Sequence, residues 1–177
     1  GFADPFSLLM NPAARAVGDK FSAGVYGERP YLLSAIQQVT TVMQFPFTAD
    51  AIGVKTQYFG SSYFNESSVG LVYAKKLTAQ VSSGIALNYY HFNAREYLSA
   101  TSLIAEGGFL FRLTDELISG VAVRLPTRKR LGKGNESLRA LYQFGLGYQP
   151  SDRFYLMVDA WKEEGDRKST RLNSSHA

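Results

Sequence analysis

The chain has 177 residues, which is enough for one domain with a buried core. Hydrophobic residues make up 45% and aromatic residues 14%, and cysteine is absent, so disorder, a disulfide scaffold and a cysteine-based metal site are excluded. The net charge of +4 falls to +2 without residues 166–177, and so gives no indication of nucleic-acid binding. No apolar run approaches the length of about 20 residues that a transmembrane helix needs.

Residues 1–19 contain a signal for the start of a helix. Asn11 is a favourable N-cap residue, Pro12 suits the first helical position, and Ala13 begins an alanine-rich stretch. The sequence therefore predicts a short capped helix in this segment.

From residue 20 to residue 163 the apolar pattern repeats every second residue, which indicates strands. In 136–149, for example, Tyr142 and Phe144 lie on one face, and Gly145 and Gly147 on the other. We expect nine strands, at about 20–27, 31–45, 50–60, 67–77, 80–90, 101–113, 116–126, 136–149 and 153–163. Gln37 and Thr41 fall on the apolar side of the second strand, so we expect a bulge there.

Three short connections recur at intervals of 36 and 37 residues: Leu77-Thr78-Ala79, Leu113-Thr114-Asp115 and Pro150-Ser151-Asp152. The apolar positions are odd-numbered on both sides of the first two connections and even-numbered on both sides of the third. Because paired residues across a hairpin lie on the same face, each loop must have an odd number of residues, and three residues fit. Such loops place Lys76 opposite Gln80, Arg112 opposite Glu116 and Ile104 opposite Arg124, with Glu106 diagonal to Arg124. Because short and long connections alternate, the pattern predicts an antiparallel up-and-down meander.

Two all-β architectures fit this alternation. A soluble barrel of lipocalin type has its apolar face inside, whereas a transmembrane barrel has it outside against lipid. Small residues on the polar face, aromatic residues at both strand ends and strands of ten to thirteen residues favour the transmembrane barrel. We therefore expect one group of apolar residues to face lipid: Leu87, Leu103, Val123, Phe144 and Leu156.

Residues 166–177 differ from the rest of the chain, because they are polar and have no apolar period. They resemble the translation of a common sequencing adapter, so we expect them to pack on nothing. The predicted regions are thus 1–19, a partial barrel over 20–165, and this tail. Nine strands leave unpaired edges, so we expect the chain to be part of a larger barrel.

The motif Asn11-Pro12-Ala13 before a glycine- and aromatic-rich barrel resembles the N-terminal segment of FadL-like outer-membrane proteins. Within that superfamily, the Leu-Thr-Asp turn and its following strand are similar to the PorV/PorQ family of Bacteroidota. The resemblance implies location in the bacterial outer membrane, a plug-like segment 1–19, and a role in type IX secretion or surface attachment with exported proteins as partners. A FadL-like channel that imports hydrophobic compounds and a soluble β-barrel binding protein are the alternatives.

Charged residues on the polar face are candidates for a polar conduit or a ligand contact. The alternative is that they form the interlocking ion pairs that fill a small barrel. They are Lys55, Glu106, Arg112, Glu116, Arg124, Arg139 and Asp159.

A second candidate is a basic loop that can bind lipopolysaccharide phosphates, or else is simply solvated. It contains Arg128, Lys129, Arg130 and Lys133. We expect no catalytic site, metal or cofactor, because His91 is the only histidine before the tail and no nucleophile or phosphate-loop motif occurs.

Overall fold

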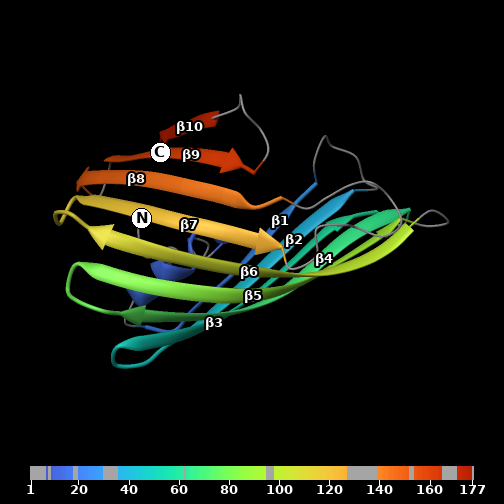
Figure 1. Cartoon of the computed structure of the whole chain (residues 1–177), viewed down its shortest axis with the longest axis horizontal. Helices are drawn as coiled ribbons and strands as arrows, with labels where there is room; N and C mark the ends of the chain where they lie inside the picture. Colours follow the sequence, from blue (N-terminus) through green and yellow to red (C-terminus); the bar gives the residue numbers. More distant parts are fainter. Residues whose placement is uncertain are drawn as a thin grey trace.

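The chain folds into a single antiparallel sheet in which each strand pairs with the next in sequence. The computed structural model describes residues 7, 9–17, 20–29, 36–61, 63–94, 98–126, 139–151, 154–164 and 171–176. Figure 1 shows the strands as a curved sheet. They are β1 (Ser22–Glu28), β2 (Gln37–Pro46), β3 (Asp50–Gly60), β4 (Phe64–Lys76), β5 (Val81–Ala94), β6 (Leu98–Arg112), β7 (Leu117–Pro126), β8 (Leu141–Ser151), β9 (Phe154–Glu163) and β10 (Arg171–His176).

The predicted all-β, up-and-down architecture is confirmed, and each of the nine predicted strands is present. Within the described residues, β1 and β10 each pair with one neighbour only, so the sheet is open. The closed transmembrane barrel is therefore not formed by these strands. No helix in the described ranges has the length and apolarity needed to cross a membrane.

A short 3-10 helix, η2 (Pro12–Val17), packs on one face of the sheet. It contacts β2, β3, β4, β5 and β6, and the sheet curls around it (Figure 1). The predicted capped helix is confirmed, because the Asn11 Oδ1 accepts a hydrogen bond from the Ala13 amide at 2.9 Å. We call the face that η2 covers the inner face, and the opposite one the outer face.

The two faces differ as the period-two pattern requires. Most inner positions are small or polar, although Val42, Val72 and Ile118 are also buried on this face. Outer positions carry large apolar side chains that are exposed; Leu87, for example, is 53% exposed. Of the five residues expected on this apolar face, Leu87, Leu103 and Phe144 are exposed, and Val123 and Leu156 are half-buried.

The bulge predicted in the second strand is absent. From Gln37 to Pro46, β2 keeps an unbroken register with β3. Val42 faces inward and is fully buried, in a cluster that includes Leu9 of the N-terminal segment. An apolar side chain is thus accommodated on the inner face, and Thr41 lies on the outer face without a change of register.

The predicted three-residue loops are confirmed in length at the first two turns, but each begins one residue later than expected. In the second turn, the Leu113 amide donates to the Leu117 carbonyl at 2.9 Å, and the Thr114 Oγ1 accepts from the amides of Glu116 and Leu117. Thr78 makes the same two contacts in the first turn. The threonine hydroxyl therefore fixes where each loop starts. The third turn includes residues outside the described ranges.

Because each of these two loops begins one residue later, the cross-strand partner of each residue shifts by two positions, and every side chain stays on its predicted face. The expected pairing of Arg112 with Glu116 is wrong, because Arg112 pairs with Ile118. Lys76 likewise pairs with Ser82 instead of Gln80. In the same register, Ile104 lies opposite Pro126 instead of Arg124.

The prediction that residues 166–177 pack on nothing is wrong for Arg171–His176. These residues form β10, which pairs antiparallel with β9 from Trp161 to Leu156. Backbone amides and carbonyls at a sheet edge can pair with any extended segment, whatever its side-chain pattern. A missing apolar period is therefore no obstacle to such pairing.

Candidate functional site

The motif Asn11-Pro12-Ala13 lies on a glycine patch of the inner face, formed by Gly84 in β5, Gly108 in β6 and Gly120 in β7. A Cβ atom at Gly84 would collide with the backbone of Pro12, and one at Gly108 with the Asn11 side chain. At Gly120 a Cβ would lie 3.1 Å from the Asn11 Nδ2. The small residues of this face therefore allow the backbone of the segment to approach the sheet closely.

Asn11 ties this segment to two neighbouring strands. Its Nδ2 donates hydrogen bonds to the carbonyl oxygens of Phe109 in β6 and Val121 in β7, at 3.0 and 3.1 Å. Pro12 and Ala13 are buried against the sheet. The two polar atoms of the Asn11 side chain thus have different functions: the oxygen caps η2, and the nitrogen binds the sheet.

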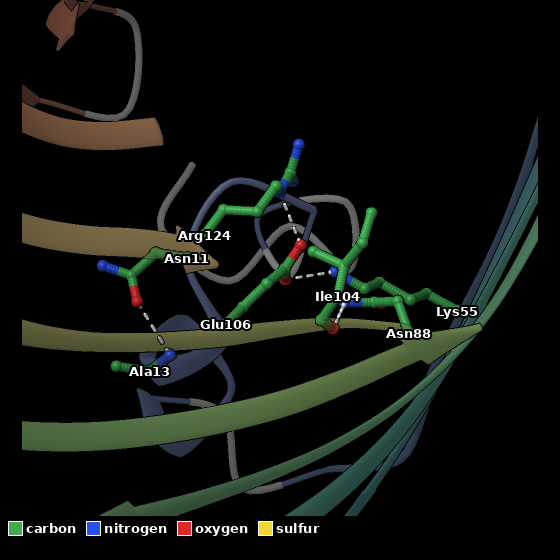
Figure 2. A network of polar contacts seen from close by, with 7 residues as sticks. All are labelled: Asn11, Ala13, Lys55, Asn88, Ile104, Glu106 and Arg124. Atoms are coloured by element: carbon green, nitrogen blue, oxygen red, sulfur yellow. Dashed lines mark hydrogen bonds and ion pairs between the residues drawn. The ribbon is translucent and has the colours of Figure 1, made fainter. Parts of the chain in front are cut away.

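Beside the motif, two cationic side chains, Lys55 and Arg124, share the carboxylate of Glu106 (Figure 2). Lys55 Nζ lies 2.7 Å from Glu106 Oε2, and Arg124 Nε lies 2.8 Å from Glu106 Oε1. Lys55 is 4% and Glu106 9% exposed, so both charges are removed from water. Each oxygen of the carboxylate therefore has a cationic donor, the condition under which a buried charge is tolerated.

The strand register explains how these residues meet. Glu106 lies directly opposite Arg124 in the β6–β7 pair, so the predicted balance between them is confirmed, although they are not diagonal as expected. Lys55 is in β3, and its side chain reaches β6 across β4 and β5. Its path is open at Gly70, where a Cβ would lie 3.0 Å from two carbons of the lysine chain.

A polar cavity of about 260 Å³ adjoins this cluster. Its wall contains two cations, Lys55 and Arg124, and two acids, Glu106 and Glu66. Amide, hydroxyl and aromatic side chains complete the wall together with Ile104, and Asn88 is held in place by donating to the Ile104 carbonyl at 3.2 Å. The arrangement can form hydrogen bonds with a polar group, and its charges are balanced.

The other predicted inner-face residues lie apart from this cluster. Arg112 and Arg139 are exposed at strand ends, and Glu116 is exposed in the turn before β7. Asp159 is buried in β9 opposite Gly145. The basic loop lies outside the described residues, with Arg128, Lys129, Arg130 and Lys133.

Sequence reasoning missed the contributions of Gly70 and Asn88. Gly70 carries no signal of its own, because its role appears only when Lys55 is known to cross two strands. Asn88 could have been noticed as an amide that follows the small residues Gly84 and Ala86 on the polar face of its strand. In the part of the chain that the structure describes, no three His, Asp or Glu side chains lie together as a metal site would require.

Comparisons of the chain with protein-family models, with curated proteins and with solved structures gave no match.

Proposed function

We propose that this chain forms part of the wall of a bacterial outer-membrane β-barrel, with its N-terminal segment inside the lumen. One observation carries the proposal: large apolar side chains are exposed along the outer face, while polar and small side chains are covered on the inner face. A soluble barrel has the opposite arrangement. An apolar face of this extent on a protein in water favours association and aggregation.

Within that class, we propose the role of a PorV/PorQ-type component of type IX secretion or surface attachment. The inner face is occupied by the motif Asn11-Pro12-Ala13 and by the Lys55–Glu106–Arg124 cluster, and the cavity beside this cluster is small, with charged groups in its wall. A hydrophobic compound in this cavity would remove water from the charged groups of its wall, which is unfavourable. A component that binds exported proteins through its loops needs no conduit for small molecules.

A FadL-like channel is the second candidate, because the contacts of the N-terminal segment can be broken and remade. Asn11 holds the segment through two hydrogen bonds of ordinary length, and a glycine patch offers a smooth surface for its movement. Displacement of the segment would uncover the inner face.

Membrane insertion is tested first, with the full chain and preformed phospholipid vesicles. Leu87→Arg places a charge on the outer face at mid-strand, where an arginine costs about 2–4 kcal/mol in a bilayer. Leu77→Arg, in the tight turn, is the matched control, because an arginine near the interface costs about 0–1 kcal/mol. We expect Leu87→Arg alone to reduce the alkali-resistant, vesicle-bound fraction. Equal insertion of both variants contradicts the proposal.

The role is tested by deleting the gene in a Bacteroidota strain and restoring either the wild type or Leu87→Arg. A secretion component predicts that exported surface proteins accumulate in the periplasm, while uptake of labelled oleate is unchanged. The channel predicts lost oleate uptake with normal export. Normal export in the deletion strain removes the secretion role, whichever result the uptake assay gives.

A further inference from the structure

The outer face contains an apolar groove of about 500 Å³ over β6, β7, β8 and β9. Two cross-strand rows of outward residues form it. The first row is Phe109, Val121, Phe144 and Ala160, and the second is Gly107, Val123, Tyr142 and Lys162. The volume lies within the range of roughly 300–1,000 Å³ that is typical of ligand sites.

The depth of the groove comes from Gly107. A Cβ atom built there meets only Val123 Cγ1, at 3.9 Å, so the space above it is open rather than filled by a neighbour. The aromatic rings of Phe109, Tyr142 and Phe144 stand around this opening and are exposed. The glycine is thus a gap in an otherwise continuous layer of large side chains.

One cation lies at the end of the second row. Lys162 is exposed, lies opposite Tyr142, and is the last residue but one of β9. Within the described residues it forms no ion pair. The groove therefore extends from the middle of the sheet to the end at which β8 begins and β9 ends.

We propose that this groove binds one acyl chain of an anionic outer-membrane lipid, with the lipid phosphate at Lys162. The inference rests on the proposed membrane location and adds a lipid site to it. Inside a bilayer an apolar chain gains no hydrophobic energy from the groove, because the surrounding lipid is equally apolar. Selectivity therefore comes from packing around Gly107 and from the charge of Lys162. One lysine near the membrane surface corresponds to a preference of about fivefold for anionic lipid.

The test uses the full chain in phosphatidylcholine vesicles. Each preparation contains the same trace amount of phosphatidylglycerol or phosphatidylcholine with a diazirine in the acyl chain. After illumination, mass spectrometry quantifies and locates the cross-links. We expect about fivefold more cross-linking from phosphatidylglycerol, concentrated on residues of the groove. Lys162→Gln should abolish the preference between headgroups, and Gly107→Leu should reduce groove cross-links from both lipids.

Two variants are matched controls. Gly27→Leu places the same side chain on the outer face of β1, where a Cβ meets only the Gln38 carbonyl at 3.9 Å. Lys75→Gln removes an outer-face lysine that pairs with Asp50 near the other end of the sheet. Both should cross-link like the wild type. Equal cross-linking of the two lipids, or cross-links spread evenly over the outer face, overturns the lipid site while leaving the membrane location intact. Failure of the wild type to insert overturns both proposals.

Discussion

Gly84 in β5 lies directly opposite Gly108 in β6, and both lie beneath the N-terminal segment. The pair leaves a bare area of backbone on the inner face, and the motif Asn11-Pro12-Ala13 occupies it. The segment can therefore lie flat on the sheet, where a side chain at either position would lift it away.

The first prediction concerns this fit. Gly84→Ala should destabilise the folded chain by about 1–3 kcal/mol, because the new methyl group collides with the backbone of Pro12, which cannot rotate away. The free energy of unfolding in urea, with the chain in detergent micelles, is the measurement. Gly107→Ala is the control, since its Cβ points into open space on the outer face. Equal effects of the two substitutions would show that the segment does not rest on Gly84.

The second prediction separates the two functions of Asn11. Asn11→Asp keeps the oxygen that caps η2 and removes the nitrogen that donates to Phe109 and Val121. We expect the segment to leave the sheet, so that trypsin cleaves after Arg15 several times faster than in the wild type. Unchanged cleavage would mean that packing of Pro12 alone holds the segment.

The third prediction concerns the shared carboxylate. Glu106→Gln leaves the buried Lys55 without a counter-charge and should cost about 3–5 kcal/mol. Lys75→Ala breaks the exposed pair with Asp50 and should cost about 1 kcal/mol or less. Urea unfolding of both variants gives the comparison.

The double variant Lys55→Met/Glu106→Gln extends this third prediction. It should recover much of the stability lost in Glu106→Gln, because it removes the unpaired buried lysine. If the double variant is less stable than Glu106→Gln, the Lys55 ammonium group stabilises the fold even without the Glu106 carboxylate, because methionine retains most of the apolar chain of lysine.

The fourth prediction concerns the turns. Thr114→Val removes the hydroxyl that accepts from the amides of Glu116 and Leu117, and should cost about 1 kcal/mol in unfolding free energy. Thr114→Ser retains the hydroxyl and should stay within a few tenths of a kcal/mol of the wild type. Thr78→Val should behave like Thr114→Val, since Thr78 makes the same contacts. A stable Thr114→Val would contradict the assigned role of the hydroxyl.

The strands and the helix cap could be predicted from sequence because each depends on local rules. Alternation fixes the face of Leu87 whatever its partner, and Asn11 before Pro12 is a helix start in any context. Loop length followed from parity, but the exact partner of Arg112 did not, because the hydroxyl of Thr114 decides where the loop begins. The odd or even numbering of the apolar positions cannot reveal a register shift of two residues, because such a shift leaves every side chain on the same face.

The remaining differences arise from tertiary contacts. Val42 is buried on the inner face because the N-terminal segment covers it, which no pattern within β2 can reveal. The meeting of Lys55 with Glu106 depends on the open path at Gly70, two strands from Glu106. The tail forms β10 through backbone pairing, for which side-chain patterns carry no information.

The contacts of Asn11 have a consequence for the order of folding. Every strand pairs with its neighbour in sequence, so the sheet can grow hairpin by hairpin from short-range contacts. Asn11 is different, because its partners Phe109 and Val121 are 98 and 110 residues away. Its binding surface exists only once β6 and β7 have paired. The N-terminal segment therefore reaches its final position only after these two strands, which come much later in the sequence, have paired.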